Sequence, residues 1–208
     1  LVRFTSEEGL KGLEMHLGLP GTVGGAIFMN SKWTKPEGYA GDVVYQAEVL
    51  TPRGERVVVP KTYFQFGYDT SIIQKTRDIV LSVVFALETD SKDRLWTIAN
   101  ESIAYRRQSQ PQGVKSAGCT FRNIGKAEVL ARSLPPEATS AGFLVDHAGL
   151  KGFKIGDAQI SPMHANFIIN LGQAAASDVV QLISSARDQV KRQFGVTLEE
   201  EIVRVGEF

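Results

Sequence analysis

The chain has 208 residues, of which 43% are hydrophobic and 22% are charged, an ordinary composition for a globular protein long enough to bury a core. Lysine plus arginine and aspartate plus glutamate both number 23, so the zero net charge gives no argument for nucleic acid or an anionic membrane as a partner. No apolar run reaches the roughly 18 residues of a membrane span, and the single cysteine, which cannot form an internal disulfide, fits a reducing cytoplasm.

In the first half of the chain, Thr5 and Glu8 form a capping-box pattern, and Leu10, Leu13 and Leu17 follow at helical spacing. We therefore expect a helix that stops at Gly18. The other elements expected in this half are a hairpin of strands at 43–50 and 56–59, a buried strand at 79–87 and a helix at 92–108.

Beyond Pro111 the expected elements are shorter, apart from one helix. That helix covers 178–194: Ser177 caps it, apolar residues form one stripe along it, and Gly195 ends it. The others are strands at 119–121, 166–170 and 202–205 and a helix at 140–148. This order of elements predicts a mixed α+β chain with a boundary near residue 110.

The segment from Gly18 to Gly25 holds four glycines and a proline in eight residues. Glycines let backbone N–H groups approach an anion closely, which suits a pyrophosphate, and a tight structural turn uses the same residues. The segment lacks the lysine and the spacing of a nucleoside-triphosphate P-loop. Both interpretations stay open on these residues.

Cys119 lies in the run Ser116–Asn123, after a glycine and before a short apolar strand. A thiol with the ordinary pKa of about 8.5 is protonated near neutral pH, so it can donate a proton. A lone cysteine is equally a small buried hydrophobe. The acidic run Glu199–Glu201 likewise predicts either a solvated surface or, if the backbone is extended there, one face carrying Glu199 and Glu201 toward a site. The three histidines show no ligand spacing, so no metal site is expected.

Taken together, the motifs resemble the UDP-N-acetylenolpyruvoylglucosamine reductase family, flavoenzymes of bacterial peptidoglycan synthesis. Each motif is weak alone, but their order and spacing cover nearly the whole chain. The matching runs are Gly12–Glu14, Gly18–Asn30, Phe66–Tyr68, Ser116–Asn123, Ala148–Gly152, Ile155–Ile160, His164–Phe167 and Phe194–Glu199.

The resemblance implies a three-part enzyme, in which two subdomains hold FAD and a third closes over a UDP-sugar. Residues 1–109, completed by 197–208, would form the second FAD subdomain, and 110–196 would form an α+β substrate-binding domain. The first FAD subdomain would precede residue 1. The chain begins without methionine, and we expect it to be part of a longer protein.

The resemblance also implies an activity and its residues. NADPH would reduce FAD, and a hydride would then reach the enolpyruvyl double bond of UDP-N-acetylglucosamine enolpyruvate, giving UDP-N-acetylmuramate in the cytoplasm. Cys119, where many members carry serine, would be the proton donor, with Glu201 as catalytic carboxylate and Asn123 as an amide near the substrate. Tyr68, Arg107 and Lys151 would bind substrate; the flavin would contact Gly18, Pro20, Gly21, Thr22, Gly24, Gly25 and Asn30. No protein partner is inferred.

Two departures from the family pattern stand out. The family usually has arginine after Phe66-Gly67-Tyr68 to polarise the substrate carboxylate, whereas this chain has Asp69. Either another cation substitutes, with Arg107, Lys115 and Arg122 as candidates, or activity is impaired. The second departure is an insertion that opens with Ser31-Lys32-Trp33.

Two rival functions follow. One is a UDP-sugar-binding module without the redox step, which Asp69 and the expected missing subdomain favour. The other is a different flavin-linked oxidoreductase, against which the substrate-facing run Ser116–Asn123 argues.

Overall fold

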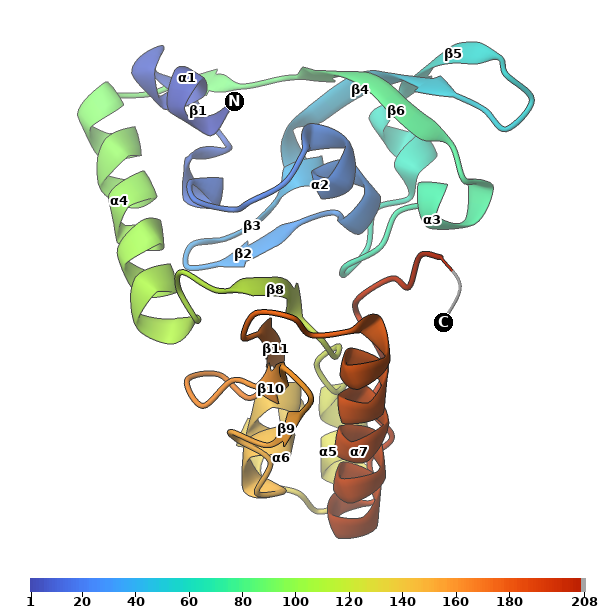
Figure 1. Cartoon of the computed structure of the whole chain (residues 1–208). Helices are drawn as coiled ribbons and strands as arrows, with labels where there is room; N and C mark the ends of the chain where they lie inside the picture. Colours follow the sequence, from blue (N-terminus) through green and yellow to red (C-terminus); the bar gives the residue numbers. More distant parts are fainter. Residues whose placement is uncertain (207–208) are drawn as a thin grey trace. The chain divides into compact units, whose positions relative to one another are not determined.

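A computed structural model describes residues 1–206, which divide into two compact units, Leu1–Arg106 and the part from Arg107 onward (Figure 1). Both units combine helices with antiparallel sheet, so the predicted α+β class is confirmed. The first unit contains α1 (Val2–Glu7), β1 (Leu10–Lys11), the 3₁₀ helix η1 (Glu14–His16), α2 (Val23–Met29), β2 (Lys32–Thr34), β3 (Glu37–Tyr39), η2 (Ala40–Val43), β4 (Val44–Leu50), β5 (Arg56–Pro60), η3 (Lys61–Phe64), α3 (Ile73–Thr76), β6 (Ile79–Phe85), β7 (Glu88–Thr89) and most of α4 (Lys92–Ser109). The last residues of α4, from Arg107, belong to the second unit.

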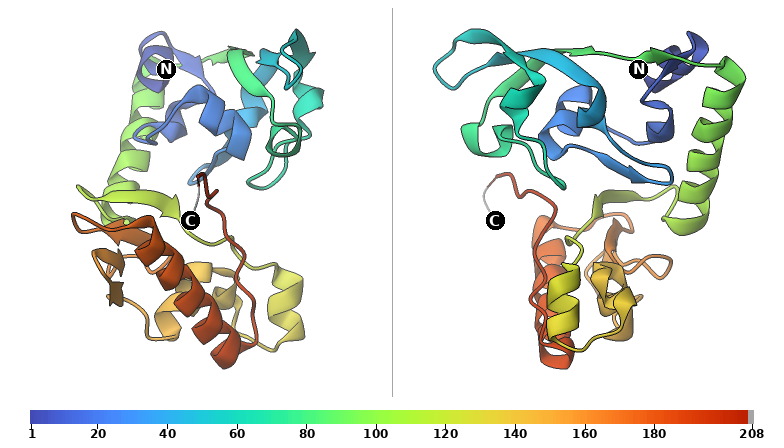
Figure 2. Two further views of the ribbon diagram at one scale, coloured as in Figure 1. Left: turned by 45° about the vertical axis from the view of Figure 1, so that its right-hand side comes forward. Right: turned by 180° about the vertical axis from the view of Figure 1, so that it is seen from behind.

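A three-stranded sheet of order β5-β4-β6 is the centre of the first unit. The predicted hairpin β4–β5 is confirmed, and the loop that joins its strands projects from the sheet (Figure 1, Figure 2). One face of the sheet packs against α2, where Ile27, Val49, Phe64 and Ile73 are almost fully buried. This core fixes the end of α2, which carries Asn30.

The prediction of a helix that continues up to Gly18 is wrong. The helix α1 ends at Glu7, a short strand follows, and η1 supplies a single further turn. Gly9 and Gly12 have φ values of 72° and 133°, which no right-handed helix accommodates. Thr5 does not cap a helix but lies inside α1, where its hydroxyl donates to the Val2 carbonyl.

The strand β6 forms as predicted but is not buried. Ile79 and Val84 are 59% and 48% exposed, because one face of the three-stranded sheet is uncovered in the described residues. The hydrophobic composition therefore predicted the position of this strand correctly, but its predicted burial was wrong.

The second unit is built on a four-stranded antiparallel sheet of order β8-β11-β10-β9, with α6 and α7 contributing to one core. Leu144, Ile160, Leu182 and Leu198 are almost fully buried there. Its elements are β8 (Lys115–Cys119), α5 (Lys126–Ala131), the 3₁₀ helix η4 (Pro136–Thr139), α6 (Ala141–His147), β9 (Lys154–Ile155), β10 (Ala158–Ile160), β11 (Phe167–Asn170) and α7 (Ala176–Phe194).

The helix α7 confirms its predicted apolar stripe, since Ile183, Ala186 and Val190 are buried. It begins before the predicted cap: Ser177 lies inside it, and Asp178 accepts a hydrogen bond from the Ala175 N–H at 3.0 Å. The predicted strand at 202–205 is wrong, because the structure forms only an isolated bridge between Glu200 and Phe121 before the chain continues without strand.

The assignment of residues 197–208 to the flavin subdomain stays a prediction. Leu198 packs in the core of the second unit, Glu200 pairs with Phe121 of the same unit, and residues 207–208 lie outside the described part.

Gly195 ends α7 in the left-handed region, at φ 70°. We expect Gly195→Ala to lower the free energy of unfolding by about 1 kcal/mol, since a β-carbon disfavours this conformation. Gly125→Ala is the matched control, because Gly125 has φ −64° and open space at its Cβ position. Urea unfolding followed by circular dichroism measures both, and equal stability of the two variants would contradict the expectation.

Candidate functional site

The glycine-rich segment of the first unit is exposed at its centre and runs directly into α2. Thr22 is the N-cap of that helix, and its Oγ1 accepts a hydrogen bond from the Gly25 N–H at 3.0 Å. The predicted loop therefore ends at Thr22, and Gly24 and Gly25 are helical. Gly18 and Gly21 have φ values of 83° and 137°, and a Cβ at Gly21 would meet nothing within 4 Å. Together with the exposed Pro20, these residues present backbone rather than side chains.

Asn30 links this segment to the loop that carries Tyr68. It ends α2 in a left-handed conformation at φ 47°, and it is buried. Its Nδ2 donates to the Gly67 carbonyl at 2.8 Å, and its Oδ1 accepts from the Gly41 N–H at 3.0 Å. Both ends of the amide thus bind backbone groups. Position 41 has no room for a side chain, because a Cβ on Gly41 would lie 2.5 Å from Asn30 Oδ1.

A pocket of about 360 Å³ opens beside Asn30 in the first unit. Tyr68, predicted to bind substrate, is 42% exposed at this pocket. The complete lining is Asn30, Tyr39, Gly41, Asp42, Lys61, Phe66, Gly67 and Tyr68. The structure therefore gathers the Phe66–Tyr68 loop, the end of α2 and the residues after β3 around one cavity.

In the second unit, the structure brings Glu201 to the segment that follows Cys119. The half-buried Cys119 is the last residue of β8 and pairs with Phe167 of β11. The Arg122 N–H donates to the Glu199 carbonyl, and the Glu201 N–H donates to the Thr120 carbonyl, both at 2.9 Å. Two candidates that are 82 positions apart in the sequence (201 minus 119) thus lie on adjoining backbone segments.

Glu200, which lies between the other two glutamates in the sequence, forms salt bridges with two arginines. Its carboxylate binds Arg187 at 2.8 Å and Arg204 at 2.8 and 2.9 Å. Burial raises the pKa of Glu200, but hydrogen bonds from Arg204 and Arg187 outweigh it and hold the pKa below the ordinary value. This carboxylate stays ionised in a salt bridge, which leaves Glu201 as the stronger candidate for proton handling.

Asn166 positions the Cys119 segment, a role that its place in the sequence did not predict. Its Oδ1 accepts from the Phe121 N–H at 2.9 Å, and its Nδ2 donates to the Phe121 carbonyl at 2.8 Å. The Asn166 carbonyl also accepts from the Thr120 N–H at 2.7 Å. Asn166 is 3% exposed, so these bonds form away from water. The available signal was an amide at the start of the strand expected at 166–170.

The remaining predicted residues of the second unit have different surroundings. Asn123 Oδ1 accepts from the Ala141 N–H at 3.2 Å, so Nδ2 is the end of this amide that would donate to a ligand. The Lys151 ammonium lies 2.6 Å from an oxygen of Asp146, and Arg107 is exposed on α4. Within this unit Glu201 is bonded through its backbone to Thr120, the residue after Cys119, and the contacts of the described residues show no such link for Lys151 or Arg107.

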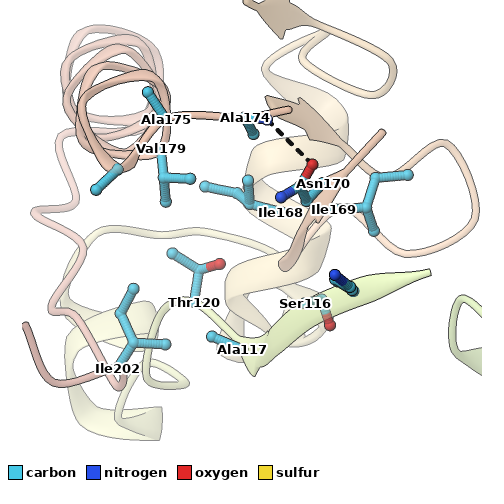
Figure 3. A pocket seen from close by; sticks show the side chains of 12 residues that line it. Ser116, Ala117, Thr120, Ile168, Ile169, Asn170, Ala174, Ala175, Val179 and Ile202 are labelled. Atoms are coloured by element: carbon cyan, nitrogen blue, oxygen red, sulfur yellow. Dashed lines mark hydrogen bonds between the residues drawn. The ribbon is translucent and has the colours of Figure 1, made fainter. Parts of the chain in front are cut away.

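A second pocket, of about 420 Å³, lies at the start of α7. Figure 3 shows Ile168, Val179 and Ile202 turned toward a common space from β11, α7 and the C-terminal segment. Lys115, one candidate to replace the family's arginine, lines it, and none of the other predicted site residues does. Its lining is mostly apolar: Lys115, Ser116, Ala117, Thr120, Ile168, Ile169, Asn170, Ala174, Ala175, Ala176, Val179 and Ile202.

Residues 1–206 include no helix with the length and hydropathy to span a bilayer. Nor do they gather three or more histidine, cysteine, aspartate or glutamate side chains in a way that could hold a metal ion.

Comparison with known proteins agrees with the motifs. A family model for the C-terminal domain of UDP-N-acetylenolpyruvoylglucosamine reductase matches residues 110–205. The curated reductase of that name from Chlamydia abortus is 42% identical over 95% of this chain and 61% of its own length. The one from Halalkalibacterium halodurans is 37% identical over 100% of this chain and 64% of its own length. The chain therefore spans about three fifths of these curated relatives.

The solved structures include a matching enzyme. The crystal structure of UDP-N-acetylenolpyruvylglucosamine reductase from Thermus caldophilus is 36% identical, with a TM-score of 0.79. The match covers 96% of this chain and 66% of that one. Sequence and fold agree along almost the whole chain, and the chain belongs to the UDP-N-acetylenolpyruvoylglucosamine reductase family.

Proposed function

We propose that this chain carries the substrate-reducing part of a UDP-N-acetylenolpyruvoylglucosamine reductase, which makes UDP-N-acetylmuramate for the peptidoglycan cell wall. Its partners are the UDP-sugar and NADPH, its cofactor is FAD, and its compartment is the cytoplasm. The observation that carries the proposal is the association of Glu201 with the Cys119 segment through the Thr120 carbonyl. An acid and a carboxylate near one reacting centre are what an enol ether reduction needs.

The glycine segment fits a flavin cofactor. Gly21 combines a positive φ with open space beyond its Cβ position, so a ligand can approach the backbone there. Thr22 and Gly25 hold the start of α2 in place. The chemistry that bound FAD would supply is transfer of a hydride from NADPH to the enolpyruvyl double bond.

The chain's own residues would handle the proton and the charge. Hydride addition leaves negative charge on the neighbouring carbon and its carboxylate, and the Cys119 thiol would protonate that carbon. Asn123 Nδ2 is the amide donor for the developing charge, because Oδ1 is held by Ala141. Glu201 would take part in proton transfer, and Asn166 fixes the backbone on which Cys119 lies. Lys151 and Arg107 would bind the UDP-sugar.

FAD binding tests the proposal directly. We expect the chain to bind FAD saturably, seen by flavin absorbance and fluorescence, and Gly21→Ala to weaken this binding by about tenfold or more. Gly54→Ala is the matched control, because Gly54 also has positive φ, at 82°, and open space, but lies in the loop between β4 and β5. Equal FAD affinity of the two variants would contradict a flavin site at the glycine segment.

One observation favours a second candidate, a UDP-sugar-binding module without the redox step. Asp69 is buried at φ 51°, in a turn where Gly67 and Thr70 exchange backbone hydrogen bonds. The arginine that the family usually has at this position is therefore replaced by an acidic residue that is buried in the turn. UDP-N-acetylglucosamine binding without any FAD binding would support this candidate over the reductase.

A further inference from the structure

The inserted hairpin of strands β2 and β3 places a lysine beside Tyr68. Lys32 pairs with Tyr39 across the hairpin. Its Nζ lies 5.4 Å from the ring centroid of Tyr39 and 5.2 Å from that of Tyr68, so two aromatic faces flank one ammonium group. The Lys32 side chain is 22% exposed. The insertion therefore contributes a partly desolvated positive charge.

The ion pair that Lys32 makes is weak. Its Nζ lies 3.5 Å from Glu37, whose side chain is 65% exposed, and surface pairs of this kind contribute little. Burial lowers the pKa of Lys32, but the Tyr39 hydroxyl and Glu37 outweigh it and raise the pKa above its ordinary value. Lys32 thus remains charged, and an incoming anion can replace Glu37.

The two rings that flank Lys32 both line the pocket of about 360 Å³ in the first unit. A second ammonium group, that of Lys61, lines the same pocket and donates to the Asp42 carbonyl at 2.6 Å. The Asp42 carboxylate is held by the Tyr39 N–H at 2.8 Å, which partly offsets its charge. The lining itself therefore carries one cation, Lys61, and one anion, Asp42, and Lys32 adds a positive charge beside the two aromatic rings of the wall.

Arg107, Lys115 and Arg122, the replacements considered for the family's arginine, all belong to the second unit. Lys32 differs from them because it lies in the same unit as Tyr68 and against its ring. We propose that Lys32 is a substrate-binding residue, which supplies the positive charge that holds the carboxylate of the enolpyruvyl sugar at the pocket lined by Tyr39 and Tyr68. This inference rests on the proposed function.

The test compares two ligands that differ in the carboxylate, UDP-N-acetylglucosamine enolpyruvate and UDP-N-acetylglucosamine. Both are titrated into the whole chain, and binding is followed by isothermal calorimetry. The wild-type chain should bind the enolpyruvyl sugar about 10- to 100-fold more tightly, the range of a hydrogen bond to a charged group. Lys32→Met should remove most of that ratio, and Lys32→Arg should keep it.

Lys35→Met is the matched control, because Lys35 lies between the same two strands and its Nζ is 4.7 Å from the ring of Tyr105 instead. It removes the same charge from the insertion and should keep the ratio. Fluorescence of Trp33, next to Lys32, reports whether each variant is folded, and Lys32→Gln replaces Lys32→Met if the latter is not.

Three outcomes overturn the inference. A Lys32→Met variant that keeps the wild-type ratio overturns it and leaves the proposed function standing. Equal weakening of both sugars overturns the carboxylate assignment, since the diphosphate is then the bound group. A wild-type chain that binds neither sugar overturns the inference together with the proposed function.

Discussion

Replacement of Cys119 by alanine is expected to lower turnover of UDP-N-acetylglucosamine enolpyruvate by about 10²- to 10⁴-fold, the usual contribution of a positioned general acid. The thiol ends β8, and the residues directly after it are fixed by Asn166 and by the Glu201 backbone. Loss of the donor should therefore act on chemistry and not on folding. The measurement is NADPH oxidation by the chain with FAD and the enolpyruvyl sugar.

Rapid-mixing experiments locate the defect. NADPH consumption in the absence of the sugar should be unchanged in Cys119→Ala, and the sugar-dependent step should be slow. Cys119→Ser keeps a hydroxyl donor and should retain much of the activity. Ser184→Ala removes an exposed hydroxyl from α7 and should behave as wild type. A Cys119→Ala variant with wild-type turnover would show that another group donates the proton.

Local patterns predicted those elements whose stability is decided by nearby residues. The hairpin of β4 and β5 and the helix α7 both follow this rule. In α7 the apolar stripe recurs at helical spacing, and Gly195 terminates it with a positive φ. The prediction of one helix up to Gly18 was wrong because the leucine spacing favoured a continuous helix, whereas Gly9 and Gly12 adopt backbone angles that interrupt it.

Long-range contacts account for what the sequence alone left open at the site. The acidic run did not separate Glu200 from Glu201, because the distinction depends on Arg187 of α7 and on the approach of the chain end to Phe121. Asn166 was visible as one amide among several, but its two bonds to Phe121 span 45 positions. Lys32 was part of an unexplained insertion until the fold placed it against Tyr68. Neither charge nor spacing encodes such pairings.

His16 carries the second large expected effect, a loss of stability in acid. It is 5% exposed, and neither ring nitrogen has a hydrogen-bond partner among the described residues. Burial and the nearby Arg106 guanidinium lower its pKa to about 4, against smaller opposing effects of Glu14 and Asp42. The ring is therefore neutral in the folded chain at pH 7.

The direction in which pH changes the stability follows from proton binding to His16 in the folded and unfolded chain. Between about pH 6.5 and pH 4 the unfolded chain protonates this histidine and the folded chain does not, so acid favours unfolding. The stabilisation is fully present above pH 6.5 and falls by about 3 kcal/mol as the pH reaches 4, at 1.36 kcal/mol per pKa unit. Urea unfolding at a series of pH values measures it. Because Trp33 and Trp96 both lie in the first unit, tryptophan fluorescence reports on the unit that contains His16.

Two variants separate titration from packing. His16→Leu and His16→Gln fill the site differently, and their stabilities at pH 7 will differ for that reason. Neither side chain titrates, so both should lose the same part of the acid slope, about 3 kcal/mol between pH 6.5 and 4. If both variants keep the wild-type slope, the acid sensitivity of the first unit arises from its carboxylates, and His16 takes up its proton in the folded chain as readily as in the unfolded one.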